Sequence, residues 1–237
     1  MQRYFAKDKV DNKIELLDSD MYHIKKVMRM NVNDNVEVIY DKKLYLCKIT
    51  DNYEIEIINE IEENNELDID VTIAIGMVKE QKFDLILQKL TELGVKEIIP
   101  LIMERSIVKL DNSKINKKLE RWNLICKEAS EQSKRNIVPK VMAPMTIKEL
   151  VKLDYDKKLI CSVKQQDNFI NSYLHFKENC VKMLIVIGPE GGVSESEEQF
   201  LNDNDFISVS LGRRVLRVET AAIYVASVIN YSCMEWL

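Results

Sequence analysis

Two segments in the last third of the chain combine glycines with charged side chains, a composition that suits ligand-binding loops. The first is VIGPEGGVSESEEQF, residues 186–200, and the second is VSLGRRVLRVETAA, residues 209–222. In each, an apolar run ends at a glycine and a helical pattern follows. Glycine permits close approach of the backbone to a ligand, and arginine supplies a positive charge. The same glycines would also suit tight turns without a ligand.

The first loop lacks the spacing of two common phosphate-binding motifs. No Lys-Ser or Lys-Thr pair follows its glycines, as a P-loop requires, and the spacing differs from the G-x-G-x-x-G of dinucleotide-binding folds. Glu190 within the loop would also repel a phosphate group that backbone N–H groups attract. We therefore expect a ligand of different chemistry.

Both loops are predicted to follow strands. Ser194 and Glu197 have the spacing of a capping box, which predicts that a helix begins at about Glu195. The second loop leaves a strand at Leu211 and Gly212 and enters the last helix. Ligands of open α/β sheets bind at the carboxyl ends of strands, so the two loops could jointly enclose one ligand.

The pattern from residue 71 onward alternates between strands and helices. Strands are predicted for VTIAIGMV, VKEIIPLIM, KLICSV, VKMLIVIG and FISVSLG. Helices are predicted for KEQKFDLILQKLTELG, which Gly94 ends, and for KKLERWNLICKEASEQSKR. Such alternation predicts an α/β fold with a mostly parallel sheet.

The first 60 or so residues instead indicate a small β-rich unit. Strands are predicted for RYFA, NVEVIY, YLCKI and YEIEIIN, with a hairpin turn at 41–43 and a short helix capped by Asp18 or Ser19. A small barrel fits this pattern. The polar run EIEENNELD then marks either a domain boundary or an exposed edge strand and loop within one domain.

The last helix, VETAAIYVASVINYSCMEWL, is apolar around most of its circumference. One stripe holds Ala222, Val225, Ala226, Ile229 and Cys233, and the opposite side holds Ala221, Tyr224, Val228 and Tyr231. A helix of this kind must be covered on both sides. Burial within the monomer and packing against a second chain both satisfy that requirement.

Composition limits the class of protein further. No signal-peptide pattern and no apolar run of membrane-spanning length occurs, so we expect a cytoplasmic protein without a membrane partner. The five cysteines and two histidines are scattered, which predicts no metal site. The net charge of −5 would oppose nucleic-acid binding, but residues 51–70 hold nine acidic and no basic residues, which leaves room for basic surfaces elsewhere.

The two loops closely resemble the signature loops of the ribosomal RNA small subunit methyltransferase E family. That family belongs to the SPOUT, or trefoil-knot, superfamily and methylates N3 of a uridine in 16S rRNA with S-adenosylmethionine. Further segments match in the family's order: MQRYF, HIKKVMRMNVND, KFDLILQKLTELGV, IPLIMERS and EASEQSKRNIVP. The resemblance implies a PUA-like β-barrel over residues 1–68 and a knotted SPOUT domain over residues 69–237. It also implies a homodimer formed through the knot and the C-terminal helix.

The resemblance also assigns residues to the cofactor and to the reaction. The implied cofactor contacts are Ile187, Gly188, Glu190, Gly191, Gly192, Leu211, Gly212, Leu216 and Arg217. Glu190 could face the cationic sulfonium or brace its own loop. Uracil N3 must lose a proton, and Arg217, followed by Arg214, could stabilise the resulting charge. No cysteine chemistry is implied, because Cys47, Cys126, Cys161 and Cys233 lie in apolar patterns and Cys180 has no activating neighbour.

The expected RNA contacts are cationic side chains in both parts of the chain. They are Arg3, Lys25, Lys26, Arg29, Arg105 and Arg135, with 16S rRNA or the small ribosomal subunit as partner. His23 is expected to be structural. Two alternatives remain, a SPOUT methyltransferase that acts on tRNA and a non-catalytic RNA-binding protein. The chain departs from the family pattern at Asn33, Val193 and Val218, and an asparagine tolerates the positive φ of the usual glycine.

Overall fold

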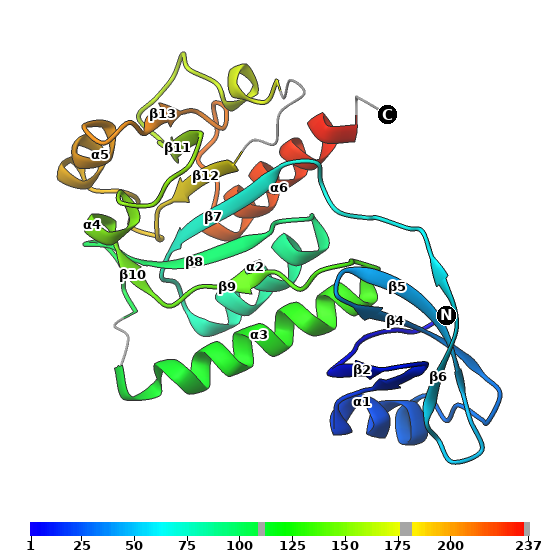
Figure 1. Ribbon diagram of the computed structural model, residues 1–237. Coiled ribbons are helices and arrows are strands. Elements are labelled where there is room, and N and C mark those ends of the chain that lie inside the picture. The colour runs from blue at the N-terminus through cyan, green and yellow to red at the C-terminus, as the bar shows by residue number, and fades with distance from the viewer. Residues whose placement is uncertain (109–111, 176–181, 235–237) are drawn as a thin grey trace. The chain divides into compact units, whose positions relative to one another are not determined.

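The computed structural model describes residues 1–108, 112–175 and 182–234 (Figure 1). The chain folds into two compact units. The first holds residues 1–66 and 127–137, and the second holds residues 67–126 and 138–237. The sequence pattern did not anticipate that residues 127–137 pack with the N-terminal unit. The domain boundary at residue 68 stays a prediction.

The first unit is built on a mixed sheet, which within the described residues has six strands in the order β1-β4-β5-β6-β3-β2. Its strands are β1 (Arg3–Phe5), β2 (Asp8–Val10), β3 (Lys13–Glu15), β4 (Asn35–Tyr40), β5 (Lys43–Ile49) and β6 (Ile55–Ile61). The turn between β4 and β5 is Asp41-Lys42, with φ of 46° and 64°, so Lys43 already belongs to β5. Two positive φ values match the twist of a tight hairpin.

A short helical segment covers the core of this unit. Helix α1 (Asp18–Tyr22) runs into one π-helical turn, His23–Val27, and Ile24 is fully buried. The predicted cap is wrong in detail, since Leu17 precedes the helix and no side chain caps it. Asn33 has a φ of 75°, the left-handed conformation that an asparagine was expected to tolerate here.

The second unit contains the α/β sheet, and the strand pairs among its described residues are all parallel, as predicted. The order in the described residues is β10-β8-β7-β12-β11-β13, with β9 beside β8. The strands are β7 (Asp70–Gly76), β8 (Glu97–Ile102), β9 (Lys140–Val141), β10 (Met145–Thr146), β11 (Lys157–Cys161), β12 (Lys182–Ile187) and β13 (Ile207–Val209). Parallel pairing places the carboxyl ends of β11, β12 and β13 at one edge.

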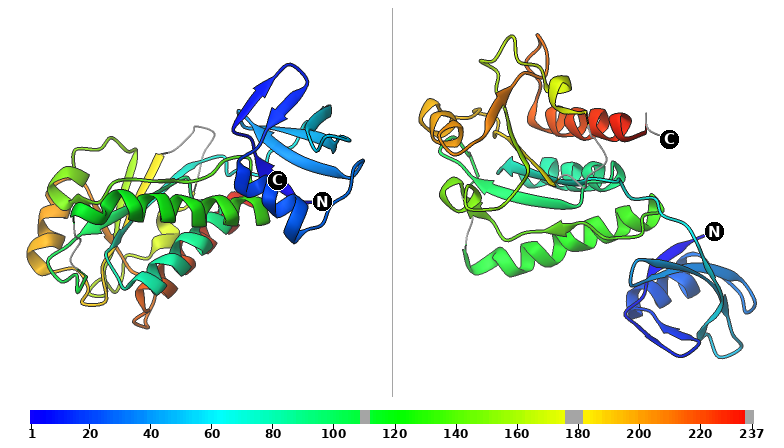
Figure 2. Two further views of the ribbon diagram at one scale, coloured as in Figure 1. Left: turned by 90° about the horizontal axis from the view of Figure 1, so that it is seen from below. Right: turned by 45° about the horizontal axis from the view of Figure 1, so that its top comes forward.

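Helices cover both faces of this sheet (Figure 2). They are α2 (Glu80–Glu92), α3 (Ile115–Gln132), α4 (Ile147–Leu150), α5 (Glu195–Asn202) and α6 (Val218–Met234), with short 3-10 turns at Asn112–Lys114 and Ile170–Tyr173. Alternate residues of β12 face opposite ways: Ile185 packs with α2, α3 and α6, and Leu184 packs with α4 and α5. Both faces are therefore buried, which is typical of a parallel sheet.

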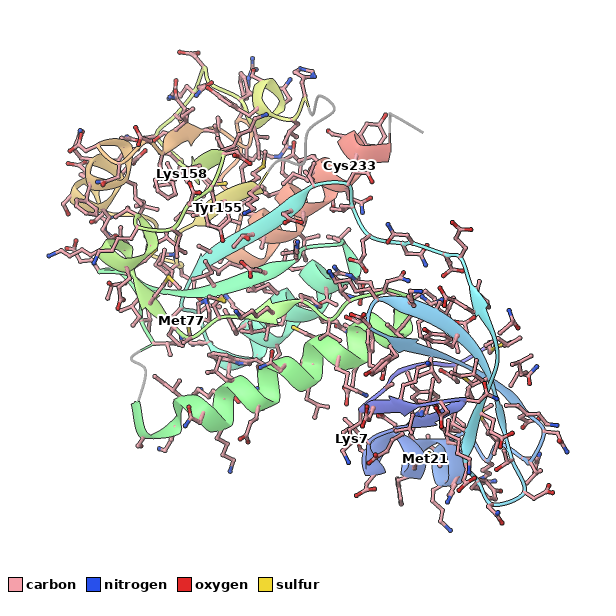
Figure 3. The ribbon with its side chains drawn as sticks, viewed as in Figure 1. Lys7, Met21, Met77, Tyr155, Lys158 and Cys233 are labelled. Carbon is pink, nitrogen blue, oxygen red and sulfur yellow. The ribbon has the colours of Figure 1, made fainter. Side chains whose placement is uncertain are left out.

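Helix α6 packs beside α2 and buries the stripe predicted for its core side. Ala222, Val225 and Ile229 are fully buried, whereas Cys233, on the last turns of the helix, is only partly covered (Figure 3). On the other side, Tyr224 is 41% exposed and Tyr231 is 64% exposed. On the second apolar side, the two tyrosines are thus open to solvent in the single chain, whereas Ala221 is buried and Val228 is partly buried.

No helix in the described part of the chain is long and apolar enough to cross a membrane.

Candidate functional site

A cavity of about 400 Å³ lies where the loops after β11, β12 and β13 meet. Its lining comprises residues 161–164, 187–190, 192–193 and 211–218, together with Lys82, Glu198 and Ala221. The two glycine-bearing loops thus enclose one space, as the sequence predicted. This volume falls within the range of small-ligand sites.

The first loop folds back on itself and then enters α5. A Cβ atom on Gly188 would lie 2.9 Å from the backbone nitrogen of Val193, so a larger residue would force the loop apart. Ser194 Oγ accepts a hydrogen bond from Glu197 N at 3.2 Å, and Glu197 Oε2 accepts one from Ser194 N at 3.1 Å. This is the predicted capping box, and it fixes the end of the loop where α5 begins.

The second loop carries the arginines. Gly212 has a φ of 115°, a conformation that other residues rarely adopt, and its N–H donates to Ser210 Oγ at 3.3 Å. Arg213, Arg214 and Arg217 line the cavity and all three are exposed. The loop therefore brings three positive charges to the cavity, together with a glycine whose backbone a ligand can approach closely.

A third segment, residues 161–164, completes the cavity and was not predicted from the sequence. It comprises the last residue of β11 and the loop after it, and β11 lies between β12 and β13 in the sheet. Ser162 Oγ accepts a hydrogen bond from Lys164 N at 3.2 Å, and Val163 is 70% exposed. The sequence does show a polar run after the predicted strand KLICSV, which indicates a loop. Only the strand order shows that this loop lies beside the other two.

Cys161 contributes a thiol to the cavity wall, but the thiol is not activated. Burial raises the pKa of Cys161 to about 12 and the pKa of Cys47 likewise. Burial, with a smaller contribution from the charge of Asp68, raises the pKa of Cys233 to about 11. These values support the interpretation of inert thiols, since a nucleophilic cysteine needs a lowered pKa. Cys180 lies outside the described residues.

Two carboxylates beside the cavity share one lysine. Lys82 Nζ, in the first turn of α2, lies 3.2 Å from Glu190 Oε1 and 3.7 Å from Glu219 Oε2. Glu190 is thereby held by a cation of the protein, which favours the bracing role over a contact with a ligand. Lys82 was not among the residues singled out from the sequence, because it is distant in the chain from both carboxylates.

Arg105 contacts the first loop. Its Nη1 donates to the carbonyl oxygens of Gly191 at 3.3 Å and Val193 at 3.4 Å. A Cβ atom on Gly191 would lie 2.9 Å from Cβ of Arg105, which explains the glycine sterically. Neither Gly191 nor Arg105 is among the described residues that line the cavity. Arg105 is exposed, so its predicted RNA contact stays a prediction.

Two predicted RNA contacts are buried in ion pairs within the first unit. Arg3 and Arg135 are each 2% exposed. Arg3 pairs with Glu37 at 2.9 Å and Glu63 at 2.7 Å, and Arg135 pairs with Glu66. Both Glu63 and Glu66 belong to residues 51–70, the segment with nine acidic and no basic residues. A phosphate could reach these guanidinium groups only if the ion pairs opened.

The other predicted RNA contacts of the first unit are exposed. Lys25, Lys26 and Arg29 follow one another on the π-helical turn and just after it, and Lys25 Nζ lies 4.7 Å from the centroid of the Tyr53 ring. His23 Nδ1 lies 3.0 Å from the hydroxyl of Tyr4, which supports the expected structural role. Lys25, Lys26 and Arg29 are exposed to solvent, where a phosphate backbone can contact them.

Comparison with protein families defines the class. A family model described as an RNA methyltransferase domain matches residues 65–230, and one described as an RNA methyltransferase PUA domain matches residues 9–58. The chain therefore contains an RNA methyltransferase domain and a PUA domain. Within the described residues, no group of three or more His, Cys, Asp or Glu side chains is placed to hold a metal ion.

Individual relatives narrow the class to one family. The ribosomal RNA small subunit methyltransferases E of Bacillus subtilis and Mesomycoplasma hyopneumoniae are 39% and 35% identical, covering 98% and 94% of this chain and 96% of their own length. A crystal structure of the enzyme of that name from Neisseria gonorrhoeae, bound to S-adenosyl methionine, superposes with a TM-score of 0.86 at 30% identity, covering 98% of this chain and 97% of that one. This chain belongs to the ribosomal RNA small subunit methyltransferase E family, which confirms the predicted family and the SPOUT fold class.

Proposed function

We propose that this protein methylates N3 of a uridine in 16S rRNA with S-adenosylmethionine and acts as a cytoplasmic homodimer. The cavity formed by three strand-exit loops, which has glycines in two of its loops and is lined by three exposed arginines, carries the proposal. Family membership supports it, and so does the cofactor named for the Neisseria gonorrhoeae relative.

The residues of the cavity fit an adenosine joined to a methionine tail. Ile187, Leu211 and Leu216 provide an apolar wall, and a Cβ atom on Gly212 would have no heavy atom within 4 Å, so the backbone is open to a ligand there. No phosphate-binding lysine is needed, because this cofactor has no phosphate. The fit also explains why a P-loop pattern is absent from the first loop.

The arginines are suited to the proton loss that uracil N3 requires. When bound, S-adenosylmethionine would supply an electrophilic methyl group. Arg217 and Arg214 line the cavity, where their permanent positive charge would stabilise the anion formed when N3 releases its proton to solvent water. Arg217 also comes directly before α6, so its backbone is fixed by the helix start. We propose that Arg217 acts on the uracil and that Arg214 assists it.

RNA binding would fall to the first unit and to the rim of the cavity. Lys25, Lys26 and Arg29 are exposed cations on one turn, and Arg105 is an exposed cation beside the first loop. Contacts of this kind fix the position of an RNA on the protein but do not recognise its sequence. Their strength should fall as salt concentration rises.

The exposed side of α6 supports the homodimer. Tyr224 and Tyr231 extend from the helix on the side away from the core, and Val228 is partly exposed between them in sequence. Aromatic side chains contribute strongly to protein interfaces. A second copy of the chain would cover this side and satisfy the two-sided apolar pattern.

Nucleoside analysis of ribosomal RNA from cells that lack this protein tests the proposal. We expect N3-methyluridine to disappear from 16S rRNA and to return when the gene is restored. Purified protein should also methylate small-subunit RNA in vitro with S-adenosylmethionine. Persistence of the modified nucleoside, or methylation of tRNA alone, would refute the proposed substrate.

A further inference from the structure

Lys82 connects the two walls of the cofactor cavity through its ion pairs. Glu190 belongs to the first loop, and Glu219 is the second residue of α6, directly after the second loop. One ammonium group lies 3.2 Å from the first carboxylate and 3.7 Å from the second. Three segments of the chain, the start of α2, the first loop and the start of α6, therefore meet at one cation.

The carboxylate of Glu219 is largely buried beside the ammonium group of Lys82. Its Oε2 atom is buried and makes no hydrogen bond within the described residues, and its side chain is 16% exposed. A carboxylate oxygen that is buried without a hydrogen bond is costly. Lys82 is the cation beside it, and the start of α6 adds favourable backbone N–H groups. The charge of Lys82 therefore offsets the desolvation of Glu219.

The position of Lys82 in its own helix is unfavourable by itself. A cation in the first turn of a helix meets the positive end of the helix dipole. The carboxylates of Glu190 and Glu219 beside Lys82 reverse that effect, because the three side chains together carry a charge of −1. The ion pairs thus serve to hold Lys82 in place, and Lys82 in turn holds the two segments together.

We propose that Lys82 is a positioning residue that sets the distance between the two cofactor-binding loops. It acts through Glu190 and Glu219 and needs no contact with the reacting atoms. The inference rests on the proposed use of S-adenosylmethionine. It also assigns Glu190 to bracing the first loop.

The affinity for S-adenosylmethionine, measured by calorimetry, tests this role. We expect Lys82→Met to weaken binding about tenfold, because the loops are no longer held at their bound spacing. The KM for S-adenosylmethionine should rise by a similar factor, whereas the KM for RNA should change less than twofold. Lys89→Met is the matched control, since Lys89 lies on the same helix, is 35% exposed against 34% for Lys82, and pairs with Glu92 away from the cavity.

Two further variants separate positioning from a general loss of structure. Lys82→Arg keeps the charge and should restore most of the affinity. In a double-mutant cycle, Lys82→Met combined with Glu190→Gln should be no weaker than Lys82→Met alone, because both changes break the same contact. Additive losses, or equal affinities for the Lys82→Met and Lys89→Met variants, would overturn the inference. Failure of the unaltered protein to bind S-adenosylmethionine would instead refute the proposed function.

Discussion

The guanidinium group of Arg3 donates a hydrogen bond to the carboxylate of Glu63, with 2.7 Å between Nη2 and Oε1. The same group donates to Glu37 at 2.9 Å and to the carbonyl oxygen of Lys134 at 2.5 Å. Arg3 thus joins β1 to β4, to the segment after β6 and to residues 127–137, all within the first unit. A guanidinium group has five N–H donors in a rigid plane, so Arg3 can bond acceptors from several segments at once better than a lysine could.

Replacing Arg3 should destabilise the first unit. Arg3→Met leaves Glu37, whose side chain is 18% exposed, with one cation fewer, and we expect a loss of about 2 kcal/mol in the free energy of unfolding. Urea denaturation followed by circular dichroism measures this. Lys13→Met is the control, because its pair with Glu54 is exposed and should contribute little to the free energy of unfolding. Equal losses in both variants would contradict the structural role of Arg3.

The elements of the fold were largely predictable because they depend on local patterns. The capping box at Ser194 and Glu197 and the helix end at Gly94, whose φ is 87°, both follow from short-range chemistry. The assignment of residues 127–137 to the first unit was not predictable. It depends on ion pairs such as Arg135 with Glu66, which join residues far apart in the chain.

The site was predictable in part for the same reason. The loops at Gly188 and Gly212 carry their signal in glycine and charge, so the sequence located two walls of the cavity. The third wall at Ser162 and the bridge at Lys82 have no such local signal. Their place follows from strand order and from the packing of α2 beside α6, which depend on the whole chain.

Gly188→Ala should damage the cofactor site more than the stability. The added Cβ would lie 2.9 Å from Val193 N and 3.0 Å from the carbonyl carbon of Gly192, so the backbone of the loop must move. We expect S-adenosylmethionine to bind at least about tenfold more weakly by calorimetry. Gly94→Ala is the control, since it strains a positive φ away from the cavity and should lower stability by about 1 kcal/mol without changing affinity. Unchanged affinity in Gly188→Ala would place the cofactor elsewhere.

Cys161 should react slowly with alkylating reagents at neutral pH. A pKa of about 12 leaves only about one thiol in 10⁴ ionised at pH 8, and the ionised fraction rises tenfold with each pH unit. Mass spectrometry after treatment with iodoacetamide at pH 7, 8 and 9 measures the rate at this residue. Rapid labelling at pH 7 would reveal an activated thiol beside the arginines and would reopen a cysteine-based mechanism.

Tyr231→Glu should dissociate the proposed homodimer without unfolding the chain. The side chain is 64% exposed in the single chain, so the added charge meets water there but would be buried in an interface. Sedimentation velocity should show a monomer with an unchanged melting temperature. Tyr22→Glu is the matched control, because Tyr22 is 63% exposed in the first unit. A protein that sediments as a monomer before any substitution would rule out the dimer itself.

Arg217→Ala should lower turnover while leaving cofactor affinity nearly intact. A preorganised positive charge aimed at a developing anion typically contributes about 10²–10³ in rate. We expect a loss of that order in the rate of 16S rRNA methylation under saturating cofactor, with less than threefold change in the dissociation constant of S-adenosylmethionine. Arg121→Ala is the control, since Arg121 pairs with Asp84 and Glu80 on α2 and does not line the cavity. Equal losses of turnover and cofactor affinity in Arg217→Ala would reassign Arg217 to cofactor binding and leave Arg214 as the candidate beside the uracil.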